Sequence, residues 1–154
     1  MTAASPLRRL YCSGGPWEDD CSGGPWEDAF GYSRAIRTGD RIIVSGCTAV
    51  VDGAVRHAGD AGGQMGVAME HALEAITALG GTLADVIQTR IYVVNRSDCQ
   101  AVGRVHGERF AEVRPAATMV LVAGLLDEEM LVEVEAEARA RQPSPMIIAD
   151  DRRE

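Results

Sequence analysis

The chain has 154 residues, of which 46% are hydrophobic and 25% are charged, and its formal net charge is −8. This length and composition predict one globular domain and exclude wholesale disorder. The negative charge and the lack of a long basic run argue against nucleic acid as a partner. No apolar run approaches the roughly 20 residues that span a bilayer, so no membrane contact is expected. Four cysteines without a signal peptide make the reducing cytoplasm the expected location.

The octapeptide CSGGPWED occurs twice near the N-terminus, at residues 12–19 and 21–28. Two copies this short cannot stack as a solenoid, which needs several units of about 20 residues or more. One copy is therefore expected to join the fold while the other forms an inserted loop. We accordingly divide the chain into an N-terminal segment with a duplicated nine-residue loop at 1–29, a main domain at 30–140 and a C-terminal tail at 141–154.

The main domain alternates strand-like and helix-like patterns. β-branched runs around Gly and Asp residues predict strands and a tight turn, and apolar residues at spacings of three and four predict amphipathic helices. The expected elements are a hairpin at 31–47 turning at Thr38-Gly39-Asp40, a helix at 64–79, a strand at 86–94, a helix capped by Asp98, and strands at 118–122 and 130–138. Because a helix separates sheet strands twice, the fold is expected to be α+β, or α/β, with both helices on one face of a single sheet.

The last strand carries alternating carboxylates. In LVEVEAEA, Glu133, Glu135 and Glu137 alternate with apolar residues, which places them on one side of the strand at intervals of about 7 Å. One interpretation is a solvated sheet face. The other is that one of these carboxylates lies in a pocket between subunits, where burial or a neighbouring charge tunes it as an acid or base.

Other candidate sites are weaker. The histidines are dispersed and no Cys-x-x-Cys occurs, so no dedicated metal site is expected. The glycine-rich stretch at 59–66 is interpreted as the entry to a helix rather than a phosphate loop. His106 is interpreted as a residue at the boundary of the core. Cys47 follows a strand, where packing is favoured over nucleophilic attack, and Gly46 allows a ligand to approach the backbone closely.

Four stretches together resemble the Rid family of reactive intermediate deaminases, also called the YjgF or L-PSP endoribonuclease family. They are GDRIIVSGCTAV, DVIQTRIYVVN, RPAATMVLVAGL and LVEVEAEA. The resemblance runs from about Gly31 to Ala138. It implies a Rid-like domain with a chorismate-mutase-like sheet and two helices, assembled as a homotrimer with small pockets between subunits. It also implies hydrolysis of imine or enamine metabolites without a metal or cofactor.

Some positions keep the residues of the family pocket. Tyr32 matches the pocket tyrosine, and Ser45 and Gly46 match a Ser-Gly pair at the preserved spacing. Glu135 is matched to the late-strand glutamate that positions or activates water. Cys47 stands where the family usually has glutamine.

Other positions depart from the family pattern. Ala117 replaces the arginine of the Pro-Ala-Arg motif, which grips the substrate carboxylate in deaminating members, and Gly103 replaces a helix asparagine. Alanine supplies neither the charge nor the bidentate geometry of that arginine. Arg34 and Arg114 are the two residues that could supply a carboxylate clamp from a new position.

Three functions follow from these matches. The leading one is a protein that binds or transforms a small metabolite, with imine hydrolysis as the nearest named reaction. The loss of the arginine at Ala117 favours the alternative of a non-catalytic ligand-binding or protein-stabilising trimer. An endoribonuclease is opposed by the net charge of −8. The resemblance also implies that the second octapeptide copy continues into the core and the first is the insertion, although the reverse arrangement stays open.

Overall fold

The computed structural model describes residues 8–11 and 25–141, and the first octapeptide copy, with the start of the second, lies outside these ranges. The helices are α1 (Pro25–Phe30), α2 (Ala61–Ala78) and α3 (Cys99–Phe110), with short 3-10 turns at Leu83–Asp85 and Arg96–Asp98. The strands are β1 (Arg8–Tyr11), β2 (Ala35–Thr38), β3 (Arg41–Cys47), β4 (Val50–Val51), β5 (Ala54–Val55), β6 (Val86–Val93), β7 (Ala116–Leu121) and β8 (Val132–Arg139).

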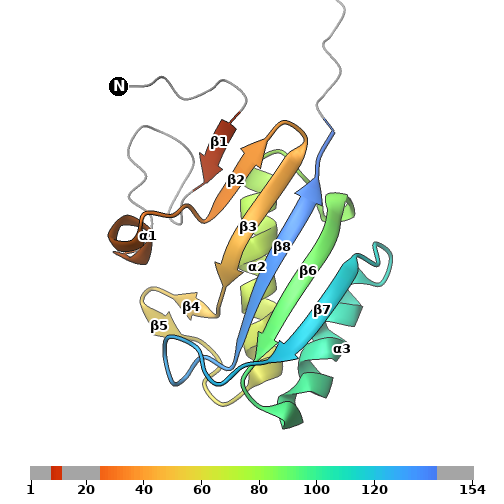
Figure 1. Cartoon of the computed structure of the whole chain (residues 1–154). Helices are drawn as coiled ribbons and strands as arrows, with labels where there is room; N and C mark the ends of the chain where they lie inside the picture. Colours follow the sequence, from red (N-terminus) through yellow and green to blue (C-terminus); the bar gives the residue numbers. More distant parts are fainter. Residues whose placement is uncertain (1–7, 12–24, 142–154) are drawn as a thin grey trace, which may run out of the picture.

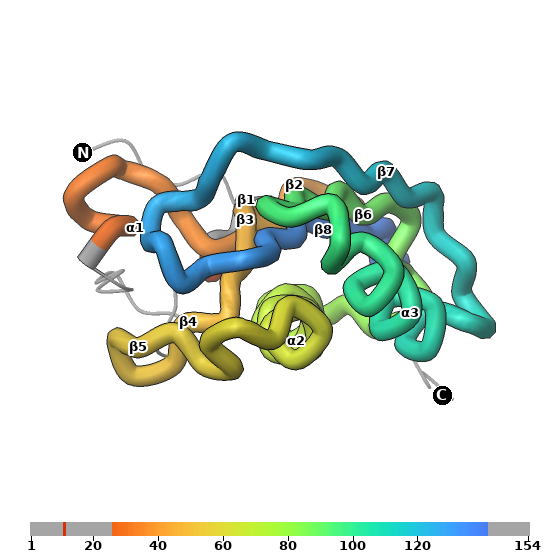
Figure 2. The backbone as a smooth tube through the Cα atoms, turned by 90° about the horizontal axis from the view of Figure 1, so that it is seen from below, coloured from red at the N-terminus to blue at the C-terminus, as the bar shows by residue number. Residues whose placement is uncertain are grey.

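One six-stranded sheet in the order β1-β2-β3-β8-β6-β7 forms the body of the domain (Figure 1). The β6–β7 pair is parallel and the other pairs of this sheet are antiparallel. Helices α2 and α3 both lie on one side of the sheet, and no described helix covers the other side, which we call the open face (Figure 2). The predicted α+β architecture, a single main sheet with two helices on one face, is confirmed.

The alternation in β8 explains why its two faces differ. Its apolar residues are buried against the helices, whereas Glu133, Glu135 and Glu137 are half-buried on the open face. On the helix side, Met65 and Ile76 of α2 are fully buried, as the apolar spacing predicts. The sheet therefore has one polar face that no described helix covers, and the glutamates of β8 lie along the centre of this face.

The predicted elements differ from the observed ones mainly at their ends. Helix α2 begins at Ala61, three residues before the predicted start, because the Asp60 side chain accepts a hydrogen bond from Gly63 N at 3.0 Å and caps the helix. Asp98 occupies the N-cap position of α3 but makes no capping bond, since its carboxylate accepts from Asn95 Nδ2 instead. The predicted hairpin is present as β2 and β3 and turns through Gly39 at a φ of +62°.

Three short elements were absent from the sequence expectations. Strands β4 and β5 form a small separate hairpin in the stretch expected to be loop. Helix α1 spans the expected boundary between the N-terminal segment and the main domain. The C-terminal end of α1 is joined directly to Tyr32. Gly31 N and Tyr32 N both donate hydrogen bonds to Glu27 O, which fixes this junction.

Two buried polar side chains fix loops at opposite ends of the sheet. Arg37, 6% exposed, donates to the carbonyls of Gly39, Leu79 and Ala140 at 2.9, 2.7 and 3.1 Å. Gln64, fully buried, donates to the carbonyls of His57 and Glu129 and accepts from Leu131 N. The amide of Gln64 thereby ties the start of α2 to the loop that enters β8.

Candidate functional site

Arg34 organises a cluster of polar groups where β3 leaves the sheet. Its guanidinium donates to Gly46 O, lies 3.7 Å from Cys47 Sγ and 3.4 Å from the Tyr32 hydroxyl, and pairs with Glu27 at 3.5 Å. Nearby, the Ser45 hydroxyl donates to Ser33 O at 2.8 Å. Five of the predicted site residues, Tyr32, Arg34, Ser45, Gly46 and Cys47, are therefore brought together within one chain.

Glu133 completes this cluster from the neighbouring strand β8. A Cβ atom at position 46 would lie 2.7 Å from Cδ of Glu133 and closer still to Oε1, so the carboxylate occupies the space that the missing side chain of Gly46 leaves. Burial raises the pKa of Glu133 above its ordinary value and repulsion from Glu135 adds to the rise, while Arg34 opposes it. A carboxyl group with a raised pKa near a guanidinium has the properties of an acid–base group.

Glu135 has different neighbours on the open face. It pairs with Arg90 of β6 at 3.5 Å, and it raises the pKa of Tyr92 after the larger contribution of burial. Its register partner is Arg90, whereas Glu133 is aligned with Tyr92. From the sequence, we matched the late-strand glutamate of the family to Glu135. In the structure, the carboxylate beside Gly46 and Arg34 is that of Glu133. Alternation alone identified both as candidates and contained no signal that separates them.

Cys47 is a buried thiol in this cluster. Its side chain is 2% exposed, and burial raises the pKa of Cys47, against the opposing effect of the nearby Arg34 guanidinium. The protonated thiol is a poor nucleophile. Packing with a weak hydrogen bond to Ser45 O at 3.3 Å therefore accounts for Cys47, in line with its sequence interpretation.

Arg114 and Ala117 lie at the other edge of the sheet, on or just before β7. Ala117 is aligned with Thr89 of β6, and that row continues through Ala136 of β8 to Val44 of β3. Three strand spacings of roughly 4.8 Å separate β7 from β3, or about 14 Å. Within one chain, Ala117 and the Arg34 cluster are therefore not parts of one small pocket.

Gly103 and His106 of α3 lie against this β7 edge. A Cβ atom at position 103 would meet Met119 Cε at 3.6 Å, and His106 Nε2 lies 2.9 Å from Thr89 Oγ1. His106 is half-buried, as expected for a residue at the core boundary, and burial lowers its pKa. The hydrogen bond to Thr89 was not foreseen, because it joins a helix to a strand 17 residues away.

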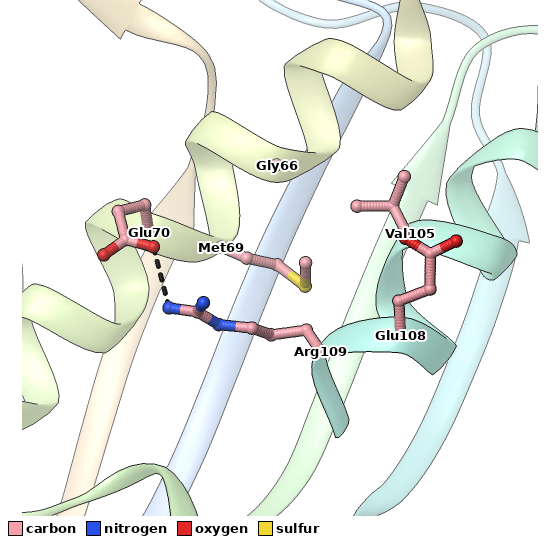
Figure 3. A pocket seen from close by; sticks show the side chains of 6 residues that line it. All are labelled: Gly66, Met69, Glu70, Val105, Glu108 and Arg109. Atoms are coloured by element: carbon pink, nitrogen blue, oxygen red, sulfur yellow. Dashed lines mark hydrogen bonds and ion pairs between the residues drawn. The ribbon is translucent and has the colours of Figure 1, made fainter. Parts of the chain in front are cut away.

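A separate groove of about 320 Å³ lies between α2 and α3 on the helix side (Figure 3). Met69 and Val105 form its apolar lining, and Glu70 and Arg109 form an ion pair of 2.8 Å across it. It contains none of the predicted site residues. Among the described residues, no group of three or more His, Cys, Asp or Glu side chains is arranged to hold a metal ion. No helix in the described ranges has the length and apolar character needed to cross a membrane.

Comparison with known proteins identifies the family. The family model described as Endoribonuclease L-PSP matches residues 26–140, which include the Arg34 cluster and the β7 edge. The chain belongs to this family. It is 44% identical over 132 residues to an uncharacterized protein of Streptomyces coelicolor, covering 86% of this chain and 91% of that one.

Two further similar proteins are a relative named for an enzymatic activity and a solved structure. A 3-aminoacrylate deaminase, RutC, of Acinetobacter baylyi is 35% identical over 80 residues, covering 52% of this chain and 63% of the deaminase. The crystal structure of Rv2704 from Mycobacterium tuberculosis, a member of the YjgF/YER057c/UK114 family, superposes with a TM-score of 0.73 at 37% identity, covering 86% of this chain and 99% of that one. The resemblance drawn from the sequence motifs is thereby confirmed at the level of family and fold.

Proposed function

We propose that this protein binds a small imine, or an enamine that tautomerises to the imine, in pockets between the subunits of a homotrimer and hydrolyses the C=N bond to a carbonyl and ammonia. The observation that carries the proposal is the Glu133 carboxyl group, which lies over Gly46 beside Arg34 and has a raised pKa. A water molecule held there can lose a proton to Glu133 as it attacks the C=N carbon. Similarity to a 3-aminoacrylate deaminase supports the reaction class.

The pocket is proposed to form between subunits because of the separation within one chain. The Arg34 cluster lies by β3 and Ala117 by β7, with β8 and β6 between them. A neighbouring subunit that sets its β7 edge beside the Arg34 cluster, at the end of β3, would bring the two halves together, and repetition of this head-to-tail contact closes a ring. The open face and the exposed Val120 and Leu121 of β7 would then be covered.

Arg34 is proposed to shape the pocket rather than to clamp a carboxylate. Its side chain is 17% exposed, and its donors already face Gly46 O, Tyr32 and Glu27. Arg114 is exposed and precedes the altered motif, so it stays the candidate for a clamp in a new position. Tyr32, 37% exposed, is the group of this cluster best placed to orient a ligand.

The test measures imine loss and ammonia release with 2-iminobutanoate for the wild type, Glu133→Gln, Glu135→Gln and Ala117→Arg. We expect Glu133→Gln to lower the enzyme-dependent rate by about 10²-fold or more, and Glu135→Gln to lower it less. Ala117→Arg is expected to raise the rate on this carboxylate substrate, because it restores an anion-binding group. Rapid wild-type turnover that Glu135→Gln abolishes and Glu133→Gln spares would reject Glu133 as the base.

Light scattering tests the assembly independently. A mass three times that of the 16.4 kDa chain at micromolar concentration is expected. A stable monomer would contradict the interfacial pocket. If every variant matches the spontaneous hydrolysis rate while the trimer forms, the non-catalytic ligand-binding or protein-stabilising trimer becomes the better description, as the loss of the arginine at Ala117 already favours. The net charge of −8 disfavours an endoribonuclease acting on a phosphate backbone.

A further inference from the structure

His106 is held in one orientation on the side of α3 that lies against β6. Its Nε2 lies 2.9 Å from Oγ1 of Thr89, a side chain only 1% exposed, and its ring packs on Phe110 at a centroid distance of 4.8 Å. Nδ1 has no hydrogen-bond partner among the described residues. One edge of the imidazole is therefore fixed by the protein, and the other makes no hydrogen bond to a described residue.

Several positions near His106 toward β7 carry small residues, while Met119 of β7 lies by α3 at 3.6 Å from a Cβ placed at Gly103. Ala117 is exposed and is aligned with Thr89 on the neighbouring parallel strand, so the two side chains lie on the same face. On α3, Gly103 and Gly107 precede and follow His106, and a Cβ atom at position 107 would meet nothing within 4 Å. A ligand group placed beside Ala117 therefore has no bulky side chain from these positions between it and the imidazole.

The imidazole offers hydrogen bonding without charge. Burial lowers the pKa of His106, which favours the neutral form of the ring. With Thr89 on Nε2, Nδ1 donates or accepts a single hydrogen bond, according to the tautomer. A neutral ring suits an amide, carbonyl or hydroxyl group, whereas a carboxylate gains far more from an arginine.

We propose that His106, oriented by Thr89, recognises an uncharged polar group of the ligand at the Ala117 end of the pocket. The preferred substrate of this protein is then a neutral imine or enamine, such as the amide of an imino acid, which binds more tightly than the imino acid itself. His106 thereby sets specificity at the place where the family motif has arginine. This inference rests on the proposed function and deepens it.

The experiment compares two stable product analogues, 2-oxobutanamide and 2-oxobutanoate, as ligands of the full-length protein. Isotope-edited NMR follows the ¹⁵N shifts of His106 and the affinity of each ketone. We expect 2-oxobutanamide to bind at least about fivefold more tightly, the ratio that one neutral hydrogen bond supports, and to shift Nδ1 of His106.

Matched variants separate recognition from packing. His106→Phe keeps a ring against Phe110 but removes the hydrogen bond, so it should weaken 2-oxobutanamide about fivefold and leave 2-oxobutanoate unchanged. Thr89→Val should weaken the amide, whereas Thr89→Ser, which keeps the hydroxyl, should retain its affinity.

The outcomes distinguish a failure of this inference from a failure of the proposed function on which it rests. Equal or tighter binding of 2-oxobutanoate, or an unperturbed His106 Nδ1 in the complex with the amide, overturns the role of His106 and leaves the proposed function standing. Failure of both ketones to bind the wild type overturns the role of His106 and the proposed function together.

Discussion

Replacing Gly46 by alanine is expected to disable the site while preserving the fold. The new Cβ would lie 2.7 Å from Cδ of Glu133, where ordinary contact begins at 3.4 Å, so the carboxyl group must retreat by at least about 0.7 Å. The backbone of Gly46 does not adopt the left-handed conformation that requires glycine. The obstacle is the mobile end of a side chain, so Glu133 can swing away while β3 stays in place.

The magnitude follows from the displacement. A misplacement of about 1 Å at a reacting group costs roughly 10²-fold in rate, so imine hydrolysis should fall by about this factor. The unfolding free energy should change by only about 1 kcal/mol, because the three nearest atoms all belong to the flexible side chain of Glu133. The carboxyl group moves toward solvent, and the pKa of Glu133 should therefore fall toward its ordinary value.

The assay combines the imine-hydrolysis rate with a ¹³C NMR titration of the Glu133 carboxyl and denaturant unfolding. Gly66→Ala is the matched control, since its Cβ would meet nothing within 4 Å on α2 and should stabilise the protein by about 0.5–1 kcal/mol with unchanged activity. A Gly46→Ala variant with wild-type activity and an unchanged Glu133 pKa would refute the reasoning. The titration stays informative even if the substrate is not an imine.

Three further predictions concern stability. Arg37→Met should cost about 3–5 kcal/mol in chemical denaturation, because it strips partners from the carbonyls of Leu79 and Ala140, whereas Arg139→Met, which breaks an exposed ion pair with Asp40, should cost less than about 1 kcal/mol. Equal losses would contradict the role of the buried guanidinium. Asp60→Ala should cost about 1 kcal/mol and Asp98→Ala less, as measured by thermal unfolding, because only Asp60 caps its helix; the reverse order would show that the capping bond contributes little. The raised pKa of Glu133 means that its carboxyl favours the folded state below its ordinary pKa and loses that contribution as pH rises through the raised value, so wild type should lose stability relative to Glu133→Gln from about pH 4 upward. A difference that does not vary with pH would contradict the burial of this carboxyl group.

Much of the candidate site could be predicted from the resemblance to the family. Tyr32, Ser45, Gly46 and Cys47 lie on a hairpin and its flanking loops, where sequence spacing fixes spatial spacing, and the structure brings them together around Arg34. The position of Glu133 beside Gly46 could not be predicted in this way. Its contact with Gly46 crosses between strands that are distant in the chain, and the irregular register between Val44 and Cys47 decides which glutamate meets Gly46.

The sequence by itself determined the family, the α+β class and the polar face of β8, because these depend on residue identity and on periods of 2 and 3.6 residues. Only the tertiary structure decided that β8 lies between β3 and β6, that Glu133 rather than Glu135 approaches Arg34, and that Ala117 lies at the far edge of the sheet. The physical reason is that alternation assigns each side chain to a face, whereas the neighbour on that face depends on strand order and register. Both are set by hydrogen bonds and core packing between segments far apart in the chain.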